Sequence, residues 1–492
     1  MFKQKHIKNI RIIFAIIVLT MFVYCFTTEG KFHEVVHLQF VPSLLFAAMG
    51  MVLPLVGLLL ATLLFGRVYC SFLCPTGILQ DVFIRIDKFF RKKKKKYHTE
   101  PPHNIVRYSL LGLTLIAWIV GFNVVVTLLD PYSLFGRIGA NILHPLTTVG
   151  NNLLALIFNA FGDYTFYNIS IKAMGWSSLI VAVVSLATIA ALSFRKGRFY
   201  CNVICPVGTL LGLISKISLF KIRVVEERCN KCLLCATQCK AGCIDSKNAT
   251  IDYSRCVACY NCLTVCKQGA LRVQWAYKKS KPAPEKIDVS KRAALATGLA
   301  AIATTALASC SSKAQAATSD ATDKPIMPPG AIDLKHFQAL CTACHLCVSK
   351  CPSQCIKPTF LEYGIAGMLQ PAMSYSVGSF CNYDCTICSF VCPNGALQRL
   401  SLDEKHNLQI GKAVFEPTRC VVYTNKTICE ACSAHCPTQA VQLVPYKDGL
   451  RIPEVNVDLC LGCGECQSVC PVRLKTAIAV SGVDVQKRLY IT

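Results

Sequence analysis

Charged residues are scarce in this sequence, and acidic residues are scarcer than basic ones. Only 16% of the 492 residues are charged and 53% are hydrophobic, with 52 Lys and Arg against 27 Asp and Glu for a net charge of +25. The chain also lacks a G-x-G-x-x-G fingerprint and a phosphate-binding loop, which argues against nucleotide chemistry. No pattern positions a general base or a nucleophile. This composition indicates a membrane protein, and the length allows about three domains.

Four apolar stretches are long enough to cross a bilayer, which takes roughly 20 residues. They lie at 12–26 (extended by its flanks), 41–65, 105–129 and 176–194. Basic residues flank them on one side, most densely at 85–96, while the loops at 27–40 and 130–175 have few. The positive-inside rule therefore predicts a multi-pass protein of the bacterial inner membrane, with these two loops outside. We attribute the basic excess to this pattern and expect no nucleic-acid partner.

An apolar segment at 151–161, in the second outer loop, is too short to span a bilayer. We therefore predict an interfacial helix there.

An internal repeat follows the second and fourth stretches. Residues 66–81 read GRVYCSFLCPTGILQD and residues 197–212 read GRFYCNVICPVGTLLG. These two boxes supply four thiols, those of Cys70, Cys74, Cys201 and Cys205. Two similar halves suggest a pseudo-twofold bundle in which the thiols converge as a metal or additional Fe–S site. The alternative is a structural motif whose prolines start helices and whose thiols stay unligated.

Residues 229–266 contain the pattern C-x2-C-x2-C-x3-C twice, which is the ligand spacing of 4Fe–4S clusters. In two-cluster ferredoxins the fourth Cys of each unit ligates the other cluster. The predicted ligand sets are Cys229, Cys232, Cys235 and Cys266 for one cluster, and Cys256, Cys259, Cys262 and Cys239 for the other. A disulfide-stapled loop is the alternative, but spacings of two residues pack sulfurs around a metal better than they pair them.

Residues 330–492 hold four further cysteine groups, each followed by Pro. The first two groups are Cys341, Cys344, Cys347 and Cys351, then Cys381, Cys385, Cys388 and Cys392. The last two are Cys420, Cys429, Cys432 and Cys436, then Cys460, Cys463, Cys466 and Cys470. Sixteen thiolates suit four 4Fe–4S clusters. Cys243 and Cys355 each lie four residues after a motif-closing Cys, and we expect both to be packing residues.

A basic linker, an apolar run at 293–309 and a flexible linker separate the two cysteine-rich parts. Lys291 and Arg292 resemble part of a twin-arginine export signal, and the residues before Cys310 resemble a lipoprotein cleavage box. An ordinary helix end is the alternative for that box. We expect a fifth helix at 293–309 and an extracytoplasmic C-terminal part.

Two further motifs have competing interpretations. The C-x-x-C-H at 341–345 matches a haem attachment site, but Cys347 and Cys351 complete a ferredoxin motif, which accounts for all four cysteines. The H-E-x-x-H at 33–37 matches a zinc-protease signature, but no third ligand is evident in its short loop. We expect an interfacial turn there. His33, His37 and His144 are instead candidate polar groups for a quinol site.

On these motifs the chain resembles two known families joined together. Residues 1–275 resemble NapH-type membrane polyferredoxins, through the two G-R-x-Y-C-x3-C-P boxes and the cysteines of 229–266. Residues 288–480 resemble NapG-type exported four-cluster ferredoxins, through Lys291-Arg292, the Pro-Pro-Gly-Ala at 328–331 and the widely spaced Cys420 and Cys429. The chain departs from the families in the fusion itself, in Lys291, and in Lys240 and Lys267, which replace the usual Pro.

The resemblance implies an electron-transfer protein of quinol-linked anaerobic respiration, with redox partner proteins and the quinone pool as its partners. Two 4Fe–4S clusters would lie in the cytoplasm and four outside it. It also implies that the four groups of the second array pair crosswise, first with fourth and second with third. The chain itself would be an electron carrier, or one component of a quinol dehydrogenase.

The expected fold is multi-domain. It comprises a four-span α-helical membrane bundle (1–222), a cytoplasmic two-cluster ferredoxin α+β unit (223–276), a linking segment (277–329) and an exported four-cluster α+β domain (330–492). The alternative function is an accessory protein that supplies electrons for maturation or metal reduction in a partner metalloenzyme. A third alternative treats the clusters as structural.

Overall fold

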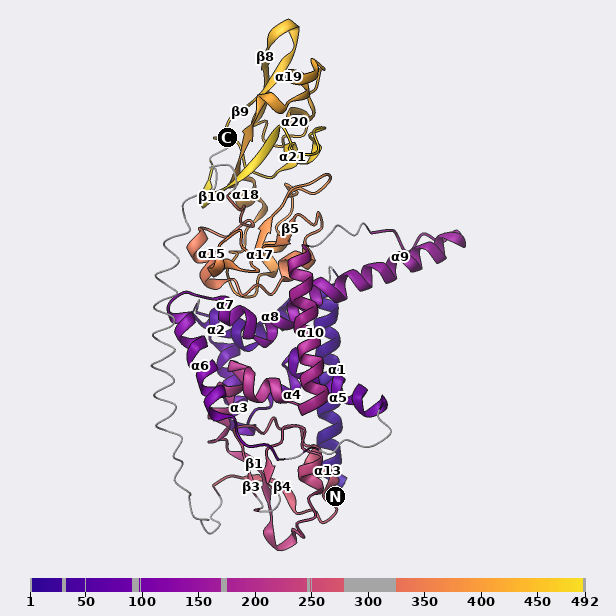
Figure 1. The fold of residues 1–492 in the computed structure, drawn as a ribbon, viewed down its shortest axis with the longest axis vertical. Helices are drawn as coiled ribbons and strands as arrows, with labels where there is room; N and C mark the ends of the chain where they lie inside the picture. Colours follow the sequence, from indigo (N-terminus) through magenta and orange to yellow (C-terminus); the bar gives the residue numbers. More distant parts are fainter. Residues whose placement is uncertain are drawn as a thin grey trace. The chain divides into compact units, whose positions relative to one another are not determined.

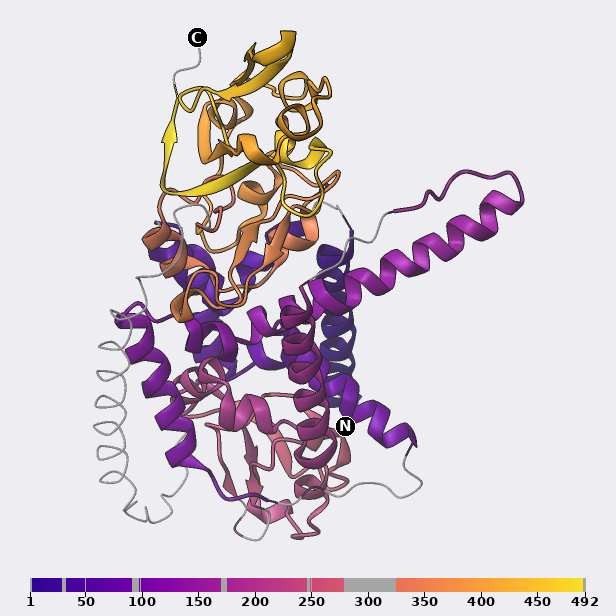
Figure 2. The same cartoon turned by 45° about the horizontal axis from the view of Figure 1, so that its top comes forward.

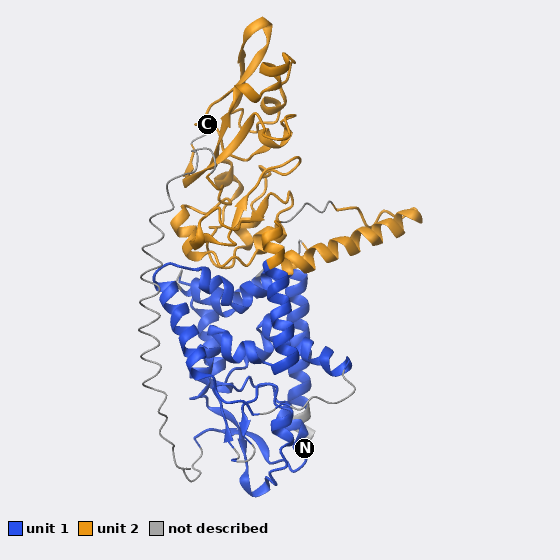
Figure 3. Cartoon of the chain, in the orientation of Figure 1, with its two compact units in different colours: residues 1–25, 30–138, 181–311 blue, residues 26–29, 139–180, 312–492 orange. Residues whose placement is uncertain are grey.

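The computed structural model describes residues 2–28, 32–48, 50–90, 97, 99–169, 175–245, 248, 250–277 and 324–489. The chain forms two compact units (Figure 3). Unit 1 comprises residues 1–25, 30–138 and 181–311, and unit 2 comprises residues 26–29, 139–180 and 312–492. The fifth helix expected at 293–309, with Lys291, Arg292 and Cys310, lies outside the described residues. The domain boundaries at 222, 276 and 329 stay predictions.

Helices form most of the first 215 residues of the chain (Figure 1). Those that lie in unit 1 are α1 (Phe2–Thr27, its last residues in unit 2), η1 (Phe32–Leu38), α2 (Phe40–Ala48), α3 (Leu53–Phe65), α4 (Tyr69–Phe72), α5 (Pro75–Phe90), α6 (Asn104–Ile119), α7 (Val124–Leu129), α8 (Pro131–Ile138), α10 (Trp176–Lys196, its first residues in unit 2), the π-helical η3 (Tyr200–Ile204) and α11 (Pro206–Ser215). Among the described residues, two helical stretches are long and apolar enough to cross a membrane, His6–Thr27 and Trp176–Lys196.

The expected spans at 41–65 and 105–129 are each divided into two helices. Gly50 has φ 94° between α2 and α3, and Gly121 has φ 82° between α6 and α7. A positive φ ends a right-handed helix, and glycine adopts it without steric cost. The four-span bundle is therefore not confirmed by helix length.

A small ferredoxin fold completes unit 1. Its antiparallel strand pairs are β1 (Phe220–Val224) with β4 (Leu271–Trp275), and β2 (Ile244–Asp245) with β3 (Thr250–Ile251). The short helices between them are η4 (Glu226–Arg228), α12 (Leu234–Thr237) and α13 (Asn261–Val265). Each of the two longer helices starts inside a cysteine motif, so the fold holds the cysteines on a loop and the helix turn that follows it.

Unit 2 contains the second cysteine array, built on three antiparallel strand pairs. They are β5 (Ile356–Pro358) with β6 (Pro371–Met373), β7 (Leu408–Phe415) with β10 (Ile478–Arg488), and β8 (Val441–Pro445) with β9 (Arg451–Val455). The helices of the array are α15 (Leu334–Leu340), α16 (Leu346–Lys350), η5 (Ile365–Gly367), α17 (Ile387–Val391), α18 (Leu402–His406), η6 (Pro417–Arg419), α19 (Val421–Asn425), α20 (Ala431–Ala434), η7 (Lys447–Gly449) and α21 (Glu465–Val469). Two buried cores, one in each half of the array, contain most of its cysteines.

Unit 2 also includes the π-helical η2 (Gly139–Leu143) and α9 (His144–Ala160). The segment at 151–161 lies almost entirely in α9, which extends away from the remainder of unit 2 (Figure 2). Its side chains Leu146, Leu153 and Leu156 are exposed. Its interfacial location stays a prediction.

Candidate iron–sulfur sites

Four cysteine motifs share one backbone conformation. In each, the residues two and four positions after the first Cys have a left-handed φ. They are Lys231 (52°), Leu233 (61°), Ala258 (49°), Tyr260 (59°), Ala343 (48°), His345 (60°), Gly462 (78°) and Gly464 (79°). Most of them are not glycine, and a left-handed conformation costs such residues about 1–2 kcal/mol each. Successive N–H groups in turns of this kind form concave nests that bind anions, which is the fit that a thiolate-ligated cluster requires.

The cradle donates hydrogen bonds to the thiols themselves. The N–H groups of Ala343 and Gly462 donate to Cys341 and Cys460. Burial raises the pKa of both thiols, and these hydrogen bonds oppose that shift because they stabilise the thiolate. The thiolate is the form that ligates iron.

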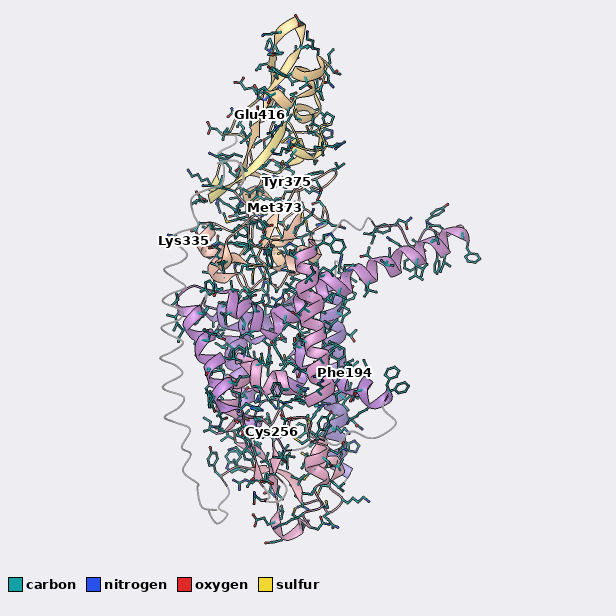
Figure 4. All side chains as sticks on the ribbon, viewed as in Figure 1. Phe194, Cys256, Lys335, Met373, Tyr375 and Glu416 are labelled. Atoms are coloured by element: carbon teal, nitrogen blue, oxygen red, sulfur yellow. The ribbon has the colours of Figure 1, made fainter. Side chains whose placement is uncertain are left out.

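In the ferredoxin fold of unit 1, Cys239 lies with the second motif. The Cys262 thiol is influenced most by the charges of Cys259, Cys256 and Cys239, and least by that of Cys235 in the first motif. Cys243 forms hydrogen bonds with both Cys239 and Cys256, which is labelled in Figure 4. The fourth Cys of the first motif therefore joins the other three of the second, the crossed arrangement expected from the spacing.

Cys243 and Cys355 have a role that the packing prediction missed. Both are buried, as expected, but each also lies with its Sγ 3.6 Å from a motif-closing sulfur, Cys239 or Cys351 respectively. These hydrogen bonds lower the pKa of Cys239 to about 6 and the pKa of Cys351 to about 6. A signal was present in the sequence, because the sister motifs have Ala270, Ala396 and Ala440 at the same offset.

In the second array the crossed pairing implied by the family resemblance is wrong. Cys347 is influenced most by the charges of Cys344, Cys341 and Cys392, and least by that of Cys388. Cys388 is likewise near Cys381, Cys351 and Cys385. The first group therefore exchanges its fourth Cys with the second group, not with the fourth. Sequence neighbours pair here because the core of each half encloses two consecutive motifs.

The third and fourth groups pair in the same way. One cavity of the array is lined by Cys420, Cys429, Cys432 and Cys470, and another by Cys436, Cys460, Cys463 and Cys466. Each cavity thus has three thiols from one motif and one from the other. These four-thiol cavities fit a cluster with one thiolate on each iron.

The two halves of the array meet at Cys381 and Cys463. The N–H of Cys381 donates to the carbonyl of Cys463 at 2.9 Å. Tyr375, labelled in Figure 4, donates its hydroxyl to the Gly462 carbonyl at 2.7 Å and lies within electrostatic range of cysteines from both halves. The four thiol sets therefore follow a linear order, in which the sets containing Cys381 and Cys463 occupy the middle.

The two boxes of unit 1 are joined by a reciprocal pair of buried arginines. Arg67 of the first box donates to the Cys201 carbonyl at 2.7 Å, and Arg198 of the second donates to the Cys70 carbonyl at 2.6 Å. The glycines three positions after each second Cys make close approach possible, since a Cβ on Gly77 or Gly208 would lie 2.2 Å from these same carbonyls. The pseudo-twofold arrangement inferred from the repeat is thus a set of matched contacts.

This arrangement brings the four box thiols together. Cys74 lies within electrostatic range of Cys70, Cys201 and Cys205, and all four are 2–3% exposed. Gln80 donates to the Cys201 sulfur at 3.0 Å, and Arg67 contacts the Cys70 sulfur at 3.7 Å. The backbone N–H groups of Gly77 and Gly208 donate to Cys74 and Cys205 at 3.4 and 3.3 Å.

The donor set around the box thiols fits an anionic cluster. Arg198 Nη2 and Arg67 Nε are buried beside these thiols without a hydrogen-bond partner among the described residues. No three ligating side chains in the described part of the chain converge closely enough for a single metal ion. The repeat in the sequence indicated these thiols, but it gave no sign of the role of the two arginines.

The His of the C-x-x-C-H motif has both ring nitrogens engaged. Nε2 of His345 contacts the Leu369 carbonyl at 2.8 Å, and Nδ1 contacts the amide nitrogen of Asn141 at 3.2 Å. Because the carbonyl can only accept, the proton is on Nε2 and Asn141 donates to Nδ1. His345 is thus held away from haem ligation, in agreement with an Fe–S motif.

Of the three histidines suggested for a quinol site, His37 and His144 have described side chains. His37 lies in η1 with its ring edge-on to Phe46, 4.5 Å between centroids. His144 begins α9 in unit 2, where burial and the charge of Lys350 lower its pKa. The side chain of His33 lies outside the described residues. Their role with quinol stays a prediction.

Comparisons with protein families agree with these thiol sets. A family described as "4Fe-4S binding domain" matches residues 47–97, 178–224 and 386–407, which include both boxes. A second family with that description matches residues 249–272, and the "4Fe-4S dicluster domain" matches residues 427–474. The dicluster match includes most of the third group and all of the fourth, in agreement with their pairing.

Several known proteins are similar to part of the chain. The methylamine utilization ferredoxin-type protein MauM of Methylorubrum extorquens is 34% identical over 203 residues, which cover 40% of this chain and 87% of MauM. The ferredoxin-type protein NapG of Escherichia coli is 30% identical over 164 residues, or 32% of this chain and 70% of NapG. The ferredoxin-type protein NapF of E. coli is 28% identical over 152 residues, or 31% and 84%. No solved structure matches.

Proposed function

Because the chain belongs to the family of ferredoxin-type proteins that includes MauM and NapG, we propose that it is a membrane-bound iron–sulfur electron-transfer protein. It passes electrons between quinol or a cytoplasmic donor and an extracytoplasmic acceptor. The ferredoxin fold of unit 1 binds two 4Fe–4S clusters and the array in unit 2 binds four. The observation that carries the proposal is the left-handed cradle, repeated in four motifs around thiols that gather in fours.

We assign a seventh cluster to the two boxes. Its ligands are the thiols of Cys70, Cys74, Cys201 and Cys205. The reciprocal arginines and the N–H···S contacts of Gly77 and Gly208 support this assignment, because both stabilise thiolates away from water. A cluster when bound supplies one-electron transfer; the residues of the chain hold it, exclude water and tune its potential through charge and hydrogen bonds to sulfur.

The proposed topology has the ferredoxin fold in the cytoplasm and the array outside. Unit 2 supports it, since it groups the array with residues 26–29 and 139–180, which include parts of both loops expected outside. Within unit 2, Lys350 donates to the Thr28 carbonyl and Asn141 donates to His345. The N-terminal part then corresponds to a NapH-type module fused to the array. A C-terminal tag should be digested by protease in intact spheroplasts; digestion only in inverted vesicles would overturn this topology.

The accessory role in metal reduction has less support. A metal-ion substrate needs thiols that it can reach, whereas the four box thiols are 2–3% exposed. Electron transfer needs no such access.

Iron content and redox titration test the proposal. The full-length protein in detergent should contain about 28 iron atoms per chain, and about 24 when the four box cysteines are replaced by Ala. The remaining clusters should be reduced by dithionite or by a quinol analogue and give EPR signals. Iron that does not fall in the box variant refutes the seventh cluster. Clusters that no donor reduces refute electron transfer.

A further inference from the structure

Lys240 stands where the motifs of the array have Pro, and unlike most lysines it is buried. The motif-closing cysteines of the array are all followed by Pro, whereas Cys239 and Cys266 of the ferredoxin fold are followed by Lys240 and Lys267. Lys267 is exposed, as expected of a lysine. Lys240 is only 6% exposed. A buried lysine requires a partner that repays its desolvation.

The partner of Lys240 is Asp81, at the end of the first box. Lys240 Nζ lies 2.6 Å from Asp81 Oδ1, Arg198 Nε lies 2.8 Å from the same oxygen, and Arg11 Nη1 lies 2.9 Å from Oδ2. All four side chains are largely buried. Three cations thus surround one carboxylate. The cluster of charges is net positive by two and sits where water screens it little.

This charge cluster lies where the boxes contact the ferredoxin fold. Arg198 donates through its side chain to the Cys70 carbonyl at 2.6 Å and through its backbone N–H to the Lys240 carbonyl at 2.8 Å. Asn202 of the second box donates to the Ala241 carbonyl at 3.1 Å. Ser71 of the first box donates to the Val257 carbonyl at 2.6 Å.

These contacts fall on one of the two ferredoxin thiol sets. Lys240 and Ala241 directly follow Cys239, and Val257 directly follows Cys256, so both contacted loops belong to the set of Cys239, Cys256, Cys259 and Cys262. Cys259 also lies within electrostatic range of Lys240 and of Arg198. We call this the proximal set. The other, Cys229, Cys232, Cys235 and Cys266, is the distal set.

We propose that Lys240, held by Asp81 and Arg198, is a positioning residue that raises the reduction potential of the proximal cluster above that of the distal one and makes it the relay to the boxes. The inference rests on the proposed function. Reduction adds one negative charge to a cluster, and a buried excess of positive charge stabilises that state. The distal cluster loses one electron and the proximal cluster gains it. No proton is exchanged, because the ion pairs persist in both states.

Lys267 provides a matched control on the same protein. It occupies the equivalent position after Cys266, but it is exposed, so solvent screens its charge. The K267M substitution should therefore leave both midpoint potentials unchanged. The K240M substitution removes a charge at the same motif position but from the buried ion-pair cluster.

The experiment is an EPR redox titration of the full-length, cluster-loaded protein. K240M should shift one midpoint to lower potential and leave the other in place, and K240R should restore it. The C232S substitution, which alters a distal ligand, identifies the unshifted signal. Equal shifts of both midpoints, no shift in K240M, or an equal shift in K267M would overturn the inference.

A second variant separates charge from structure. D81N removes the negative member of the same cluster of charges and should shift the proximal midpoint upward, opposite to K240M. A purely structural role would give both variants the same loss of iron or the same direction of shift. Unchanged midpoints on fully loaded clusters refute only this inference, whereas a protein without reducible clusters refutes the proposed function.

Discussion

The hydrogen bond from Cys355 to Cys351 provides a quantitative test of how this protein tunes its clusters. The two sulfurs are 3.6 Å apart, and Cys355 is buried. A neutral intramolecular hydrogen bond contributes about 0.5–1.5 kcal/mol net, and a thiol is a weak donor, so the low end applies. Reduction makes the ligand sulfur more negative and strengthens the bond. We take a difference of about 0.5 kcal/mol between redox states, which corresponds to roughly 20 mV for one electron.

The C355A substitution should therefore lower one midpoint of the array by about 20 mV. C355S replaces the thiol by a stronger donor and should keep that midpoint at or above its original value. The assay is an EPR redox titration of the full-length protein, with iron measured on each preparation. C25A, a buried cysteine of α1 outside every thiol set, is the control. An unchanged or higher midpoint in C355A, with full iron content, would refute the hydrogen-bond argument.

Three further outcomes are expected. G208A should abolish assembly of the box site, because its Cβ would lie 2.2 Å from the Cys201 carbonyl. The control G112A, in α6, adds a Cβ that meets nothing within 4 Å and should be neutral or stabilising in a thermal melt. Equal effects of G208A and G112A would contradict the packing. H345F should destabilise unit 2 by about 1–3 kcal/mol in denaturant, because it leaves the Asn141 amide nitrogen and the Leu369 carbonyl without this partner. The control is H435F, at a side chain that is 53% exposed, and a loss no larger in H345F than in H435F would oppose this. Burial and Lys350 lower the pKa of His144, so its stabilising contribution is present above about pH 6.5 and is lost as the pH falls through the folded pKa. Thermal melts of H144Q should lose this acid sensitivity. A pH profile of H144Q identical to that of the unsubstituted protein would count against the prediction.

The cysteine motifs were predictable because their chemistry is local. Ligands separated by two or three residues must lie on one loop, so spacing alone predicted three of the four thiols in each regular set. The crossed partner within the ferredoxin fold also followed, since one two-motif unit leaves a single alternative. In the second array four motifs allow several pairings, and only the packing of the two halves decides that Cys351 joins Cys381.

Other features depend on long-range contacts that the sequence does not encode locally. The reciprocal bonds of Arg67 and Arg198 join positions 134 and 128 residues apart. Both arginines are visible in the repeat, but nothing in their spacing indicates where their side chains point. Asp81 is another example, because the second box has Gly212 at the equivalent position, so the asymmetry was visible and its meaning was not. The helix breaks at Gly50 and Gly121 were not predicted, because the apolar residues on both sides of each glycine together are long enough to span a bilayer.

The pairing of consecutive motifs separates the order of clusters in space from the order of cysteines along the chain. The last motif, Cys460 to Cys466, contributes to a set in the middle of the array, while Cys470 joins the terminal set with Cys420, Cys429 and Cys432. The earlier Cys420 motif therefore occupies the end of the series, and the later one bridges to Cys381. Electrons that enter at the set containing Cys341 would thus pass from the first half to the Cys463 set before reaching Cys429. A chain ending before Cys460 would lose both clusters of the second half and not one, because the final motif supplies thiols to each.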